Sequence, residues 1–328
     1  AIVLGFLGYS TAALVLFFDI GQPFRFWHPL VYWQTHSLLW EITMCVVLYL
    51  SVLVAELVPI IVQHPLFYDH PLIERYPILQ RVSDLLQRLA HFLHNIGPAL
   101  AVVGLTLSLL HQASLGATYG VLSGRGLWFN PTAPVFFVLS AISGGTSLLL
   151  LLSILVFRVM RPGLVPDDVF YDIARIIGAA ALLCIYIRIW DWAVTNYYSF
   201  DIEISTQKAL LNTIAPYSET FWIGQVSFAL IPGLILLFAK RIRNFKIITV
   251  ASALPVICLI LVRWNYNFSG LIASISYDPF TPTVNLNSYL PTWQEWAVAA
   301  GVISYWLLGF SLAARYLPFH DLTGGEHA

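Results

Sequence analysis

The chain has 328 residues, of which 59% are hydrophobic, 15% aromatic and 10% charged. Soluble domains carry about 25% charged residues, so this composition, with a mean hydropathy of +0.78, excludes a soluble globular protein and predicts an integral membrane protein. The formal net charge of −1 gives no reason to expect a nucleic acid partner.

Apolar runs long enough to cross a lipid bilayer, which takes about 20 residues, occur along the whole chain. They predict eight spans, near residues 1–18, 37–62, 96–115, 132–157, 172–192, 220–239, 247–266 and 294–316. No long polar linker separates these runs, so we expect a single membrane domain over residues 1–328. The predicted fold class is therefore all-α, a polytopic bundle of transmembrane helices.

Two shorter patterns add detail to this bundle. Over residues 77–94, apolar side chains recur at helical spacing opposite polar ones, which predicts an amphipathic helix lying on the membrane surface. In the fourth run, the spacings Ser140–Gly144 and Ser143–Ser147 predict close helix packing.

Lysine and arginine are unevenly divided between the two sets of connections. Eleven of the 16 cations fall on the side where Ala1 lies, three fall on the other side, and Arg188 and Arg263 lie inside spans. By the positive-inside rule, the first side is cytoplasmic, and so is the C-terminus. The long outward connections 193–218 and 265–293 are then candidates for docking an outer partner.

The orientation places several titratable groups at one depth, near the outer surface. Glu41 lies about one turn inside the second span, and spans that run outward bring further polar groups to the same level. These groups are Asp19, Glu41, His111, Gln112, Arg188, Asp191 and Arg263. Glu56, about 22 Å further along the second span, approaches the cytoplasmic side.

Such a layer suits the chemistry of a quinone. An ionisable residue inside a span costs about 3 kcal/mol on insertion scales, so it usually faces the bundle interior and serves a site. A quinone takes up electrons together with protons, so its pocket needs hydrogen-bond donors, a proton-exchanging carboxylate or His, and an apolar mouth. The side chains that fit are Glu41, His111, Gln112, Arg188 and Asp191, beside Trp40, Trp190 and Trp192.

Each of these residues has a structural alternative. Arg188 and Asp191, at positions i and i+3, would neutralise each other at a helix end. His111 alone would be a hydrogen-bonded core histidine, and the tryptophans would form an aromatic belt. Arg263 and Asp19 would be ordinary interfacial residues.

The residues for metal or haem chemistry are poorly placed. Cys45, Cys184 and Cys258 lie one each in three spans without a CxxC motif, so no iron-sulfur cluster and no disulfide framework is expected. Of the nine His, only His111 lies well inside a span. Two axial His facing each other are not available, so we expect neither haem nor another metal site in this chain.

Five segments resemble a known family. They are FLGYSTAALVLFFDIGQP (6–23), SLLWEITMCVVLY (37–49), LSLLHQASLG (107–116), RIWD (188–191) and LPTWQEW (290–296). They resemble the NrfD-like, or polysulfide reductase, superfamily of membrane subunits, and most closely its hydrogenase-2 type, HybB. Subunits of that type are expected to have ten spans, so the eight seen here would be the last eight.

The resemblance implies a function. It is that of a quinone-interacting subunit of a respiratory complex in a bacterial or archaeal cytoplasmic membrane, with no redox centre of its own. Electrons would pass between menaquinone, or another quinone, and an outer-face ferredoxin-like iron-sulfur subunit. The large and small subunits of a nickel-iron hydrogenase, or another catalytic subunit, would complete the complex.

The resemblance also implies roles for residues. Catalytic roles fall on Glu41, His111 and Asp191, and Glu41 with Glu56 would form a proton route that makes electron transfer electrogenic. Quinone binding falls on Glu41, His111, Gln112, Arg188 and Asp191, and the shared depth near the outer surface adds Asp19 to this set.

Other functions stay open. Membrane subunits of molybdopterin or multihaem cytochrome complexes with quinone activity share these features. A proton channel or secondary transporter would also place acids and an Arg inside spans, and Pro232 and Pro255 interrupt two of them. A purely structural anchor for an outer enzyme would explain the outward connections but not the buried acids.

Overall fold

The structure is a computed structural model that describes residues 1–62, 64, 67, 70–122, 128–160, 162–197, 202–277, 282–287 and 289–317. Seven helical runs in these residues are long and apolar enough to cross a membrane. They are α3 (Leu38–Val62), α6 (Gly97–Gly120), α7 (Ala133–Ile154) with the π-helix η3 (Leu155–Met160), α8 (Asp167–Tyr197), α10 (Tyr217–Glu219) with the π-helix η4 (Thr220–Ser227) and α11 (Phe228–Leu237), α13 (Phe245–Ile272), and α14 (Trp293–Tyr316). The protein is a multi-pass, all-α bundle of membrane helices, as the sequence predicted.

The first predicted span corresponds to α1 (Ile2–Asp19). By length and hydropathy it qualifies as a span only together with η1 (Pro23–Arg25) and α2 (His28–Val31), from which it is separated by a bend of 118°. If α1 and the bent segment after it are counted as one span, the described residues contain up to eight spans, which is the number predicted.

The chain packs as two compact units. Unit 1 comprises residues 1–111 and 291 onward, and unit 2 comprises residues 112–290. In unit 1, α1 packs on α3 and α14, and α3 packs on α5 (Pro77–Asn95), which follows α4 (Pro71–Arg75). Helix α5 covers the predicted amphipathic segment, and its place on the membrane surface remains a prediction, as does the single-domain organisation.

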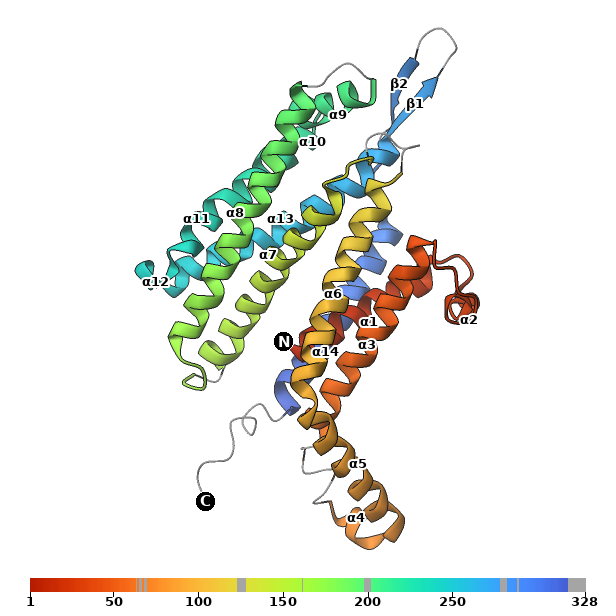
Figure 1. Cartoon of the computed structure of the whole chain (residues 1–328). Helices are drawn as coiled ribbons and strands as arrows, with labels where there is room; N and C mark the ends of the chain where they lie inside the picture. Colours follow the sequence, from red (N-terminus) through yellow and green to blue (C-terminus); the bar gives the residue numbers. More distant parts are fainter. Residues whose placement is uncertain are drawn as a thin grey trace. The chain divides into compact units, whose positions relative to one another are not determined.

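Unit 2 is a four-helix bundle (Figure 1). Helix α7 packs on α8, α8 on α11, α11 on α13, and α13 on α7, which closes the ring. Glycines let these helices approach closely: a Cβ on Gly178 of α8 would lie 2.5 Å from the backbone nitrogen of Leu237 in α11. The bundle is filled by side chains no more than 2% exposed, among them Leu150, Phe170, Ile177, Leu236 and Ile248.

Several helices extend beyond the predicted spans. Helix α8 begins at Asp167 rather than at 172 and ends at Tyr197 rather than at 192. Its first turn carries Asp167 and Asp168, which favour a helix N-terminus through the helix dipole but which a search for apolar runs passes over. Helix α13 likewise continues to Ile272 rather than stopping at 266.

The two long outward connections contain regular structure. Residues 193–218 hold the end of α8 and α9 (Ile202–Asn212). Residues 265–293 hold the end of α13 and an antiparallel hairpin of β1 (Ala273–Tyr277) and β2 (Pro282–Leu286). Short α12 (Ala239–Ile242) makes the turn between α11 and α13.

Candidate functional site

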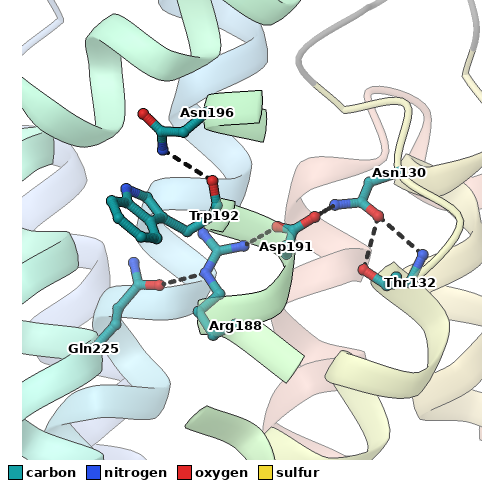
Figure 2. A network of polar contacts seen from close by, with 7 residues as sticks. All are labelled: Asn130, Thr132, Arg188, Asp191, Trp192, Asn196 and Gln225. Carbon is teal, nitrogen blue, oxygen red and sulfur yellow. Dashed lines mark hydrogen bonds and ion pairs between the residues drawn. The ribbon is translucent and has the colours of Figure 1, made fainter. Parts of the chain in front are cut away.

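A buried polar network surrounds Arg188 of α8 in unit 2 (Figure 2). Arg188 Nη1 lies 3.1 Å from Asp191 Oδ2, and Arg188 Nε donates to Gln225 Oε1 over 3.2 Å. Arg188 is only 9% exposed. Both sides of the guanidinium are therefore fixed, one by a carboxylate and one by an amide oxygen.

Aromatic rings surround the same guanidinium. Its Cζ lies 5.3 Å from the ring centroid of Phe136, 5.2 Å from that of Phe221 and 5.5 Å from that of Tyr266. A cation within about 6 Å of a ring face is attracted by the ring quadrupole. These rings come from α7, η4 and α13, so the charge is held at the centre of the four-helix bundle.

Asp191 is held by a residue that precedes α7. Asn130 Nδ2 donates to Asp191 Oδ1 over 2.8 Å, and Asn130 Oδ1 accepts from the backbone nitrogen of Thr132, at 2.9 Å, and from its Oγ1, at 2.7 Å. The side-chain oxygen of Asn130 is thus held by Thr132 just before α7, and its side-chain nitrogen is directed at the carboxylate of Asp191 (Figure 2).

Gln225 reaches the network from a π-helix. Single-turn π segments inside α-helices are frequent at functional sites, because the wider turn changes the direction of side chains. Here η4 carries Gln225, which is 3% exposed, toward Arg188.

A second cation in unit 2 is held in a similar way. Arg263 Nη2 donates to Gln112 Oε1 and to the backbone oxygen of Phe137, each over 3.2 Å, and its Cζ lies 3.7 Å from the ring centroid of Phe137. Arg263 Nη1 is buried and has no hydrogen-bond partner among the described residues. Arg263 is thus packed into unit 2 by these contacts.

Unit 1 carries the remaining candidates. Glu41 and Glu56 lie on the single helix α3, and both side chains are partly buried. His111 of α6 is 9% exposed, and its ring lies 5.5 Å from the ring of Tyr9, which in turn lies 4.5 Å from that of Tyr49. His111 Nδ1 is buried without a hydrogen-bond partner in the part of the chain that the structure describes, unlike the satisfied core histidine of the alternative interpretation.

Arg188 also lines two cavities of unit 2. The core cavity leaves about 20 Å³ of space for water-sized molecules and lies among α7, α8, η4, α11 and α13. The rim cavity leaves about 40 Å³ of such space, and its wall includes Asn130, Gln207 and Leu211 of α9, and Asn265. Pockets of small molecules combine an apolar wall with a few placed polar groups in the same way.

The structure therefore divides the predicted site residues into two sets. Glu41, Glu56 and His111 belong to unit 1, whereas Gln112, Arg188 and Asp191 belong to unit 2. It joins Arg188 to Asp191 in an ion pair, which agrees with the structural alternative to a site role. Asp19 ends α1, and its side chain lies outside the described residues.

Two members of the network escaped prediction. Gln225 is a polar residue inside an apolar run, and that signal was available in the sequence. Asn130 lies in a connection, where an Asn is unremarkable, and nothing in the sequence links it to Asp191.

The tryptophans have their own partners. Trp192 Nε1 donates to Asn212 Oδ1 over 2.9 Å, Trp40 Nε1 donates to the backbone oxygen of Pro29 over 2.9 Å, and Trp190 is 63% exposed. These contacts and this exposure agree with the aromatic belt that was the alternative to a site role.

The membrane helices of this protein enclose charged and polar side chains, which usually serve a site. The protein is therefore classed as an integral membrane protein with polar sites inside its helix bundle. The comparison with known families specifies the class further. Residues 2–273 match the family described as "Polysulphide reductase, NrfD", and the chain belongs to this family.

Relatives cover nearly the whole chain. It is 30% identical, over 97% of its length and 73% of the relative's, to the "Menaquinone reductase, integral membrane subunit" of Nitratidesulfovibrio vulgaris. It is 23% identical, over its full length and 78% of the relative's, to a selenate reductase subunit of Mesobacillus selenatarsenatis. Neither comparison singles out the HybB type.

Proposed function

We propose that this protein is the membrane subunit through which a respiratory oxidoreductase complex exchanges electrons with menaquinone. The name of the relative from Nitratidesulfovibrio vulgaris supports menaquinone as the substrate. The complex lies in a bacterial or archaeal cytoplasmic membrane, with the C-terminus of this subunit on the cytoplasmic side.

The observation that carries this proposal is the buried Nδ1 atom of His111, which lacks a hydrogen-bond partner among the described residues. A buried polar atom left unpaired costs about 1–3 kcal/mol, so it is usually retained for a reason. A quinone carbonyl oxygen is an acceptor that an imidazole N–H can meet. The rings of Tyr9 and Tyr49 beside His111 suit the apolar body of the same molecule.

Reduction of a quinone also requires protons, and carboxylates inside the spans can supply them. Glu41 and Asp191 are the proposed proton-exchanging groups together with His111. Asp19, Gln112 and Arg188 are the other polar groups proposed for quinone binding. Glu56, on the same helix as Glu41, is proposed to lie on a proton route from the cytoplasmic side, which would couple electron transfer to proton translocation.

The electrons pass between menaquinone and partner subunits. We propose an outer-face ferredoxin-like iron-sulfur subunit as the direct partner, with a nickel-iron hydrogenase of the HybB-associated type behind it. The similarity to a selenate reductase subunit favours a second candidate, a complex that reduces an inorganic substrate. Mass spectrometry of the complex purified through a tag on this chain distinguishes the two.

The test of the quinone role uses the assembled complex. Menaquinone turnover is measured for Glu41→Gln and His111→Phe beside turnover with a soluble dye that bypasses the membrane subunit. We expect each substitution to lower menaquinone turnover by about 100-fold, in the range of lost acid-base catalysis, and to leave the dye reaction unchanged. Unchanged turnover of both substrates would mean that Glu41 and His111 have structural roles and would contradict the proposal.

A further inference from the structure

Gln225 forms part of the wall of the core cavity in unit 2. The polar and thiol groups of that wall come from four elements: Ser140 and Ser143 on α7, Cys184 and Arg188 on α8, Gln225 on η4 and Cys258 on α13. Ser140, Ser143, Arg188 and Gln225 are each at least nine-tenths buried. A few buried polar side chains therefore face a cavity whose wall is otherwise mainly apolar.

The orientation of the Gln225 amide follows from its contact with Arg188. Oε1 of Gln225 accepts from Nε of Arg188 over 3.2 Å. The opposite orientation would set the NH₂ group of the amide against the N–H groups of the guanidinium, which are donors only. Nε2 is thereby directed away from Arg188, and this buried atom has no hydrogen-bond partner among the described residues.

The same wall offers acceptors and space. Oγ of Ser140 donates to the backbone oxygen of Phe137 over 3.0 Å, which leaves its lone pairs available to accept from another donor. The space open to a water molecule in this cavity is about 20 Å³, which exceeds the ~10–15 Å³ that a cavity needs to hold one water. Apolar cavities in proteins stay dry, whereas cavities with several polar partners hold water.

We propose that the core cavity is a water-binding site, and that Gln225, held by this water on one side, positions Arg188 on the other. The water accepts from Gln225 Nε2 and donates to the serine hydroxyls. The amide then keeps its oxygen toward Arg188, whose guanidinium is in turn directed at Asp191. The positioning role rests on the proposed function, whereas hydration of the cavity is tested independently of it.

Hydration can be read from a native thiol. Sγ of Cys258 donates to the backbone oxygen of Gln225 over 3.6 Å, and Cys258 lines the core cavity. The purified complex is treated with Ag⁺, a small thiol-reactive cation that enters hydrated cavities. The protein is then denatured and alkylated, and peptide mass spectrometry measures the fraction of Cys258 that Ag⁺ has protected from alkylation. Cys45, buried in unit 1, is the internal control.

We expect Cys258 to react with Ag⁺ at least about tenfold faster than Cys45, and we expect Gln225→Leu or the double change Ser140→Ala, Ser143→Ala to slow that reaction. The serine changes add no bulk, so they provide a result even where Gln225→Leu does not assemble. Equal rates for Cys258 and Cys45 in the parent complex would mean a dry cavity and would overturn the proposal.

The positioning role is tested by comparing Gln225→Leu with Gln225→Glu. The glutamate keeps an oxygen toward Arg188, so we expect menaquinone turnover to fall about tenfold or more in Gln225→Leu and to recover largely in Gln225→Glu, with the dye reaction unchanged in both. Parent-like turnover in Gln225→Leu would overturn the positioning role alone. If Glu41→Gln and His111→Phe also kept parent-like turnover, the proposed function itself would fail.

Discussion

Arg188 and Asp191 form a buried ion pair one turn apart on α8, with Nη1 3.1 Å from Oδ2 and side chains that are 11% and 13% exposed. At a surface, such a pair contributes little, because water screens it. Inside the apolar bundle, each charge is stabilised mainly by its opposite partner. Gln225 accepts a further hydrogen bond from Arg188, and Asn130 donates one to Asp191.

This dependence predicts the result of a double-mutant cycle. Arg188→Met and Asp191→Asn should each lower the free energy of unfolding by about 3 kcal/mol, because each leaves an uncompensated buried charge. The double mutant should lose clearly less than the sum. Reversible unfolding of the protein in mixed micelles measures all four corners.

The same helix provides the control pair. Asp172 and Arg175 have the same i, i+3 spacing, with a separation of 3.7 Å and side chains that are 52% and 51% exposed. Their coupling should stay below about 1 kcal/mol. A coupling in the buried pair no larger than in this exposed pair would show that burial does not strengthen it.

The sequence predicts the helical fold well because one physical signal dominates it. A membrane span must be apolar over its length, so α3, α7 and α14 follow directly from apolar runs. The end of α13, residues 267–272, could not be predicted in this way, since it holds Asn267 and Ser269 and resembles a loop.

The candidate site was predictable only in part, for a related reason. A charge inside a span is conspicuous, so the sequence singles out Arg188 and Asp191, and the ion pair between them agrees with the structural alternative that their i, i+3 spacing offered. The partners of a charge depend on tertiary packing. Asn130 reaches Asp191 across 61 positions of the chain, and Arg263 reaches Gln112 across 151, and no local pattern encodes either contact.

Close helix packing in unit 2 predicts a second result, on stability. At Gly178, an added Cβ would lie 2.5 Å from the backbone nitrogen of Leu237 and 2.8 Å from the backbone oxygen of Gly233. Because backbone atoms cannot rotate away, Gly178→Ala should force α8 and α11 apart and lower the free energy of unfolding by about 1–3 kcal/mol.

Gly145 is the matched control for this change. It also lies inside a membrane helix, α7, but a Cβ there would meet no atom within 4 Å. Gly145→Ala should therefore be neutral or slightly stabilising, since Ala has the higher helix propensity. Equal losses in the two variants, measured by the same unfolding assay, would point to glycine flexibility rather than contact as the cause.

The apolar face of α5 leads to the last prediction. Ile78, Leu85 and Phe92 project from this helix at seven-residue intervals, and each is more than half exposed in the structure, with Leu85 at 66%. Burying such side chains in the headgroup and acyl boundary removes their apolar surface from water. We therefore expect this face of α5 to lie in the membrane interface.

A spin label attached at Leu85→Cys, with the native cysteines replaced by serine, tests this in membranes. The label should collide more often with oxygen dissolved in lipid than with a water-soluble relaxation agent. A label at Arg88→Cys, on the polar face, should show the reverse preference. The contrast between the two sites carries the test, because a helix that projects into water would give both labels the water-soluble preference, and a helix covered by a partner protein would protect Leu85→Cys from both agents.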